Sequence, residues 1–267
     1  MPTRIADRLG ILAGGCSVVQ VARASGPGSG WTADCWTLDA DDIGRLLDAY
    51  RELLSPSYDQ KVRELLQGHG IDLDALLVDE GGSRDLITRA DLCELAAAAS
   101  LLAASGWPPG RLHMPNVPKG SRKKSESGID AVSTTLLAGE AGDLAVGELL
   151  QLASVKHTIT SAASLRAELV TSVMKEFTQV YLATQLRVYE ERLRQLEPGL
   201  ETDRVFLFLD GFPDAGHVRI VAVAVVDPGL EQDLAARLLR LPDVPDGVYS
   251  MRILYVPGLA SLHERAV

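Results

Sequence analysis

The segment that most constrains the fold is residues 217–228, HVRIVAVAVVDP, which is almost continuously apolar and rich in β-branched side chains. A strand with one face in water alternates apolar and polar residues, whereas a strand covered on both faces does not. The segment therefore predicts a central strand with other structure packed on each side. A sheet covered in this way is typical of the mixed α/β class.

The hydrophobic spacing of the flanking segments alternates between that of helices and that of strands, as expected for this class. Helical spacing over 88–105 begins with a capping box at Thr88 and Asp91, and it returns over 163–196. Between these helices, residues 128–137 and 147–158 resemble the two strands of a hairpin, joined by the turn-prone AGEAGD. Further strands are predicted at 17–24, 204–212 and 250–259, and further helices at 39–54, 60–70 and 231–242.

The length of 267 residues allows one large domain or a domain with an extension. We predict an N-terminal, α-rich region over 1–85 of unassigned role, followed by a mixed α/β domain over 86–267. The three cysteines, Cys16, Cys35 and Cys93, lie too far apart for a zinc motif or a disulfide framework. Because no apolar run reaches 18 residues, we expect no membrane span and a cytoplasmic location.

The formal net charge of −10 argues against a protein that coats nucleic acid through bulk charge. The distribution of charge is more informative than its sum. Residues 111–124, RLHMPNVPKGSRKK, carry five basic side chains and no acidic one. This segment predicts contacts with phosphate groups, although a solvated polar loop would have the same composition.

The candidate chemistry lies on the predicted hairpin, where Asp130 is early in one strand and Lys156 is late in the other. An antiparallel pair brings these two positions together. Because side chains alternate along a strand, Lys156 shares a face with Ser154 and Leu152, while Val155 points to the other face. A lysine on an otherwise apolar strand needs a partner, and Asp130 is the obvious one.

The run Gly128-Ile129-Asp130, followed by Ser154-Val155-Lys156 and then a helix with Glu168, resembles the PD-(D/E)XK nuclease superfamily. The usual motif has an acid two residues before the lysine, where this chain has Ser154. One branch of the type II restriction endonucleases also has serine there and takes the carboxylate from the following helix. Glu168, twelve residues after Lys156, matches that arrangement.

The resemblance implies a restriction-endonuclease-like core, a mixed sheet flanked by helices, and a Mg²⁺-dependent DNA endonuclease of prokaryotic restriction or anti-phage defence. Asp130 and Glu168 would bind Mg²⁺, Lys156 would orient the attacking water, and Ser154 would be a neighbouring hydroxyl rather than a nucleophile. Glu94, on the preceding helix, would be a further metal ligand. The residues implied to contact DNA phosphates are Lys119, Arg122, Lys123 and Lys124.

Several alternatives remain at this level. The serine at 154 and the acidic charge also suit an inactive nuclease-fold subunit, which would bind nucleic acid or act as an adaptor in a defence complex, as a homodimer or with a partner subunit. A solvated charged face would account equally well for Glu168, and the neutralisation of a buried arginine would account for Glu94. Glu148 lies about 26 Å from Lys156 along an extended strand, too far to share its site. His157 should point away from Lys156.

Overall fold

The computed structural model describes part of the chain: residues 19–25, 32–38, 41–42, 44–45, 90, 92–98, 100–101, 111–113, 130–135, 143–144, 146–159, 164–165, 168–169, 171–172, 183–184, 186–187, 190, 202–209, 216–230 and 249–261. Its strands are β1 (Val19–Ser25), β2 (Thr32–Thr37), β3 (Arg111–His113), β4 (Ala131–Thr135), β5 (Leu149–Thr158), β6 (Val218–Val226) and β7 (Tyr249–Tyr255). Short 3-10 helices are η1 (Thr202–Leu209), η2 (Pro228–Leu230) and η3 (Leu259–Ser261).

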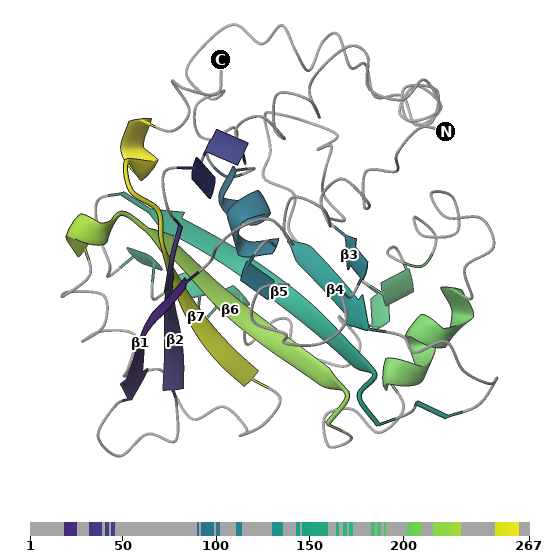
Figure 1. Cartoon of the computed structure of the whole chain (residues 1–267). Coiled ribbons are helices and arrows are strands. Elements are labelled where there is room, and N and C mark those ends of the chain that lie inside the picture. The colour runs from purple at the N-terminus through teal and green to yellow at the C-terminus, as the bar shows by residue number, and fades with distance from the viewer. Residues whose placement is uncertain are drawn as a thin grey trace, which may run out of the picture.

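The described strands form one mixed sheet in the order β1-β2-β7-β6-β5-β4-β3 (Figure 1). Strands β2, β7, β6 and β5 run parallel to one another, while β1, β4 and β3 pair antiparallel with their neighbours. Described helical residues accompany the sheet between 90 and 101, between 164 and 172, and between 183 and 190. The mixed α/β class predicted from the sequence is confirmed.

The central strand β6 has the burial that its apolar sequence predicts. Eight of its nine residues are buried, and only Arg219 is exposed. Strand β6 lies between β5 and β7, so its edges as well as its faces are covered. A strand in this position has little need for polar side chains on either face.

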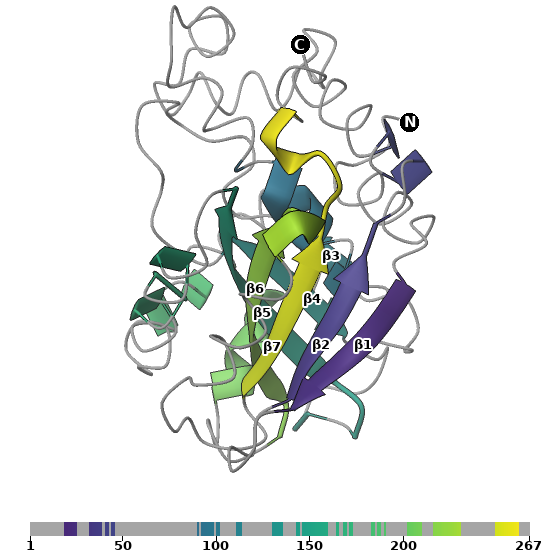
Figure 2. The same cartoon turned by 90° about the vertical axis from the view of Figure 1, so that its left-hand side faces the viewer.

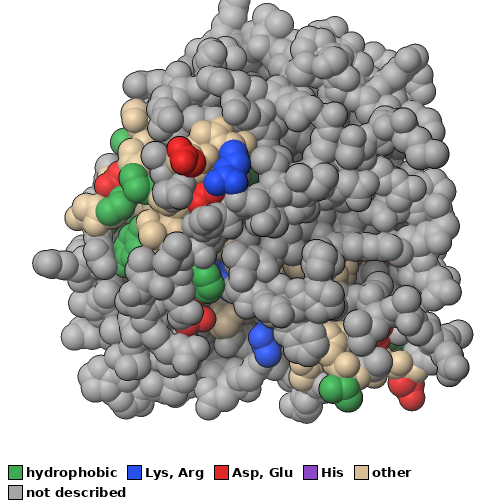
Figure 3. Space-filling view, viewed as in Figure 1, with side chains coloured by type: hydrophobic (Ala, Val, Ile, Leu, Met, Phe, Trp, Pro, Cys, Tyr) green, Lys and Arg blue, Asp and Glu red, His purple; other side chains and the backbone are tan. Residues whose placement is uncertain are grey.

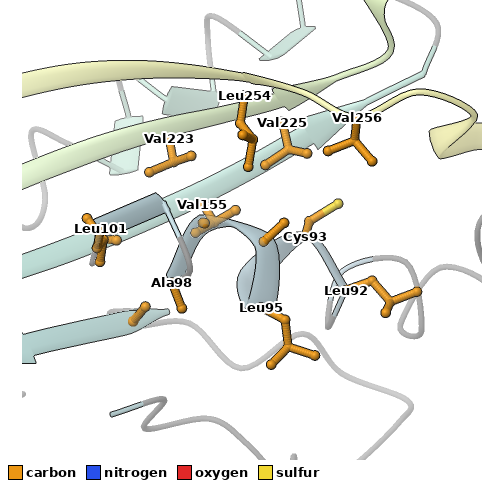
Figure 4. Packing of buried hydrophobic residues seen from close by; sticks show 14 of the residues in the cluster. Leu92, Cys93, Leu95, Ala98, Leu101, Val155, Val223, Val225, Leu254 and Val256 are labelled. Atoms are coloured by element: carbon orange, nitrogen blue, oxygen red, sulfur yellow. The ribbon is translucent and has the colours of Figure 1, made fainter. Parts of the chain in front are cut away.

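The two faces of the sheet are covered by different segments. On the first face, helical residues between 90 and 101, called here the 90–101 helix, pack on β5, β6 and β7 (Figure 4). Figure 4 shows Cys93 of this helix pointing toward Val225 and Val256. On the second face, a separate cluster is formed by residues of β4, β5 and β6 together with the helical residue Leu186 and Phe208 of η1. Its buried members are Val132, Leu150, Leu152, Leu186, Phe208 and Val218.

The predicted hairpin is present as β4 and β5. Their antiparallel register runs from Ala131 opposite Ala153 to Thr135 opposite Leu149. Strand β3 adds to the outer side of β4, also antiparallel. After β5 the chain crosses over to β6, which lies parallel to β5, so the connection must return along the sheet.

The strand predicted over 204–212 is wrong. Residues Thr202–Leu209 form the 3-10 helix η1, and Phe208 is buried against the second face. The periodicity of a short apolar run does not distinguish a strand from a buried helical turn. This run lies in the connection between β5 and β6, where it packs on the sheet as a helical turn. The predicted helices over 60–70 and 231–242 lie outside the described residues.

Two strands from the N-terminal part of the chain join the sheet. Strand β2 pairs parallel with β7, and β1 pairs antiparallel with β2, so both continue the sheet beyond β7 (Figure 2). The sheet therefore extends across the boundary predicted between residues 85 and 86. In the described part of the chain, no helix is both long and apolar enough to cross a membrane.

Candidate functional site

Asp130 lies immediately before β4, next to the carboxyl end of β5. Its backbone N–H donates to the carbonyl of Ala153 at 2.9 Å, and its side-chain Oδ2 accepts a hydrogen bond from the N–H of Val155 at 2.7 Å. The residue is 5% exposed. The carboxylate is therefore held against the β5 backbone one residue before Lys156, as the hairpin prediction requires.

Lys156 projects from the second face of the sheet. Val155 belongs to the cluster under the 90–101 helix, whereas Leu152 belongs to the cluster on the opposite face. Because side chains alternate along a strand, Ser154 and Lys156 share the face of Leu152. This confirms the orientation predicted from the sequence. Lys156 is partly exposed and lies two residues before Thr158, where the strand ends.

Ser154 connects this face to the next helix. Its side chain is fully buried, and its Oγ lies 2.6 Å from the Oγ of Ser172. Ser172 belongs to the helical residues between 164 and 172, called here the 164–172 helix. Leu165 and Leu169, on the same side of this helix, are also buried. The 164–172 helix therefore packs on the face from which Lys156 projects.

Glu168 is exposed on this helix, at the border of its buried side. It precedes Ser172 by four residues, which places the two side chains about 40° apart around the helix axis and about 6 Å apart along it. The helix begins close after β5 and returns along it, since residue 172 reaches residue 154. Glu168 therefore lies on the side of Ser172 that faces the carboxyl end of β5. Lys156 lies on the same side of Ser154, about 6.6 Å further along the strand.

Glu94 occupies a different place. It is 7% exposed on the 90–101 helix, which covers the first face of the sheet, opposite to Lys156. Among the residues that the structure describes, no three His, Cys, Asp or Glu side chains gather closely enough to hold a metal ion. The role of Glu94 as a further metal ligand stays a prediction.

The two alternative residues on β5 are placed as expected. Glu148 precedes the amino end of the strand, where its carbonyl accepts a hydrogen bond from His217 Nδ1 at 2.9 Å. It lies at the end of the strand far from Lys156. His157 alternates with Lys156 and so belongs to the first face.

The predicted phosphate contacts Lys119, Arg122, Lys123 and Lys124 lie outside the described residues. Of the five lysine and arginine residues of the basic segment, only Arg111 falls on a described element, the short strand β3. On the face seen in Figure 3, acidic and basic side chains of the described residues lie beside one another rather than in a field of one sign.

A buried arginine, which the sequence analysis did not find, lies on the first face. Arg252 on β7 donates from Nη1 to Ser100 Oγ at 3.0 Å, and its guanidinium lies 5.3 Å from the centre of the Trp36 ring. Burial lowers the pKa of Arg252 to about 10, although nearby Asp34 acts to raise it. The only sequence signal was a basic residue inside the apolar run MRILYV.

Asp227 is a second acid at the carboxyl edge of the parallel strands. It follows β6, and its two carboxylate oxygens accept hydrogen bonds from the N–H groups of Gly229 at 3.0 Å and Gly258 at 3.2 Å. Gly258 has φ of 72°, a conformation that favours glycine. Asp227 therefore joins the segments that follow β6 and β7.

No protein-family model matches this chain, and no curated protein does either. The functional argument therefore depends on the geometry around Asp130, Ser154, Lys156 and Glu168.

Proposed function

We propose that this protein is a Mg²⁺-dependent endonuclease of the PD-(D/E)XK type that hydrolyses DNA phosphodiester bonds, in prokaryotic restriction or anti-phage defence. The observation that supports it most is the β4–β5 register. It brings the carboxylate of Asp130 against the N–H of Val155, directly before Lys156. An acid and a lysine 26 residues apart in sequence thus lie at adjacent strands, with the acid hydrogen-bonded to the residue before the lysine.

The order of elements also supports the proposal. From residue 90 onward the chain gives a helix, the antiparallel strands β3, β4 and β5, a helical crossover, and the parallel strand β6. This order is compatible with the core that the motif resemblance implies, a mixed sheet flanked by helices. The helical residues around Glu168 lie within this crossover.

The donor set is suited to Mg²⁺, a hard cation that binds oxygen ligands. Mg²⁺ commonly takes one or two protein carboxylates and completes its shell with water and substrate phosphate. Asp130 and Glu168 would hold it, with Glu94 as the further ligand that the motif resemblance implies. When bound, the ion would neutralise charge on the phosphate and lower the pKa of a water molecule.

The protein's own groups have separate tasks in this proposal. The Val155 N–H fixes the Asp130 carboxylate, so its position does not depend on the ion. The partly exposed Lys156 amine orients the attacking water and offsets negative charge that develops on the phosphate. Ser154 is buried and bonded to Ser172, which excludes it from the role of an exposed nucleophile.

A second candidate function is an inactive subunit of the same fold that binds nucleic acid or a partner protein. The exposure of Glu168 favours it, because a metal ligand is usually held by neighbours. The two candidates differ in one measurable property. Only the first predicts strand cleavage that depends on a divalent cation.

The test is a cleavage assay on supercoiled, linear and single-stranded DNA and on RNA, with Mg²⁺ or with EDTA. We expect Mg²⁺-dependent cleavage of DNA by the wild-type protein. Asp130→Asn keeps an oxygen that can accept from Val155 but removes the charge, so we expect the rate to fall by about 100-fold or more.

Asp227→Asn is the matched control, since Asp227 also accepts backbone hydrogen bonds at this edge of the sheet. It should cleave at close to the wild-type rate. Circular dichroism would establish that both variants are folded. Wild-type protein that binds DNA without cleaving it would favour the inactive subunit, and equal rates for Asp130→Asn and the wild type would refute the proposed site.

A further inference from the structure

We propose that Ser172 is a positioning residue, which holds the 164–172 helix at the depth and register that place Glu168 level with Lys156. The inference rests on the proposed function, because it assigns a purpose to the contact between the helix and β5. It starts from the 2.6 Å separation of Ser154 Oγ and Ser172 Oγ.

The contact is close and lies inside the protein. Ser154 is 0% exposed, and Ser172 is partly buried. A hydrogen bond between two hydroxyl groups is directional, so it restricts sliding and rotation of the helix more than apolar contacts do. Leu165 and Leu169 supply the apolar contacts, which would tolerate a small shift. The serine pair therefore provides the specific part of this packing.

The register follows from the direction of the chain. The connection from Thr158 to Ser164 is short, and the helix then runs back along β5 until Ser172 meets Ser154. Measured along the helix, Glu168 lies about 6 Å from Ser172 in the direction of this connection. Measured along the strand, Lys156 lies about 6.6 Å from Ser154 in the same direction. A rotation of one residue, about 100°, would turn Glu168 away from this level.

The same contact explains the serine at position 154. The hydroxyl of Ser154 is already at hydrogen-bond distance from the helix and its side chain is fully buried, so a longer side chain would have to push the helix outward. An aspartate or glutamate at position 154 would not fit while the helix lies this close to β5. In this chain the helix approaches closely and supplies the carboxylate from Glu168.

The experiment measures cleavage rate against Mg²⁺ concentration and, separately, against DNA concentration. Ser172→Ala removes the hydroxyl. Ser172→Thr and Ser172→Val introduce side chains of nearly equal shape, of which only threonine keeps the hydroxyl. The control is Thr171→Ala, at an exposed position on the same helix.

We expect Ser172→Ala and Ser172→Val to need about tenfold more Mg²⁺ for half of the maximal rate. Ser172→Thr and Thr171→Ala should match the wild type. The KM for DNA should stay unchanged in all four variants, because the hydroxyl does not contact the substrate. Loss of fold alone would lower the amount of active protein without moving the Mg²⁺ midpoint.

If Ser172→Ala proves unfolded by circular dichroism, the comparison of Thr with Val decides the question. Equal Mg²⁺ midpoints for Thr, Val and wild type would overturn the positioning role while leaving the nuclease proposal intact. A wild-type protein that cleaves no substrate at any Mg²⁺ concentration would instead overturn the proposed function, and this inference with it.

Discussion

The two faces of the sheet near the end of β5 differ in what their side chains contact. On the first face, Val155 is buried with Val223 and Leu254 beneath the 90–101 helix. On the second face, the next residue, Lys156, is partly exposed, and its neighbour Ser154 is hydrogen-bonded to a different helix. One face is closed by apolar packing, and the other combines polar contacts with access to solvent.

The difference shows how a single strand can contribute to the core and to a partly exposed polar face at once. Because adjacent side chains point to opposite faces, one residue step separates a core position from the position of the proposed site. Substitutions on the first face should therefore change the free energy of unfolding. Substitutions on the second face, at the end of β5, should change cleavage.

The largest expected effect is that of Lys156→Met on the second face. Methionine keeps the length of the side chain but removes the amine, so we expect the cleavage rate to fall by about 100- to 10,000-fold. The free energy of unfolding should change by less than about 0.5 kcal/mol, because the amine is partly exposed. Single-turnover cleavage and urea denaturation measure the two quantities. A large loss of stability would show that Lys156 is a structural residue.

A smaller effect, of the opposite kind, is expected for Leu254→Ala on the first face. Leu254 is fully buried beneath the 90–101 helix, and removing its branched end leaves a cavity. We expect the free energy of unfolding to fall by about 2–5 kcal/mol. At a temperature where the variant is folded, cleavage should continue at the wild-type rate.

Val146→Ala is the matched control for Leu254→Ala, since Val146 is 96% exposed. Its unfolding free energy should stay within about 0.5 kcal/mol of the wild type. Loss of cleavage by folded Leu254→Ala would mean that the two faces are coupled, against the division of roles described above.

The sequence was sufficient for features that depend on local pattern. The apolar run of β6 and the turn-separated runs of β4 and β5 have clear periods, and the antiparallel pairing of a hairpin then brings Asp130 towards Lys156. The alternation of side chains along β5 correctly separated Val155 from Lys156. These inferences need only neighbouring residues and strand geometry.

Features that depend on distant partners were not predictable in this way. Strand β2 pairs with β7, more than 200 residues later, and nothing in its sequence, TADCWT, identifies that neighbour. The contact between Ser154 and Ser172 depends on the path of the crossover helix. Glu94 was predicted from its helix, but residues on all sides of that helix are buried, so the sequence did not reveal which face it covers.

The smallest expected change concerns Arg252, a charged residue that is buried on the first face. Arg252 is buried, and its pKa is lowered to about 10, so its charged form is less favourable in the folded protein than in the unfolded chain. This cost is present in full below pH 10 and is relieved as the pH rises above about 10, where the unfolded chain still binds the proton.

We therefore expect Arg252→Met to leave the unfolding free energy at pH 7 within about 1 kcal/mol of the wild type, or to raise it, because an apolar side chain of similar length fills the space. Ser100 keeps its hydrogen bond to the carbonyl of Ala97 when the guanidinium is removed. Arg252→Ala should instead lose about 3 kcal/mol through the cavity it creates. Urea denaturation of both variants measures the difference. If methionine destabilises as much as alanine, the contacts with Trp36 and Ser100 outweigh the cost of burying the charge, and the first face depends on a polar contact as the second does.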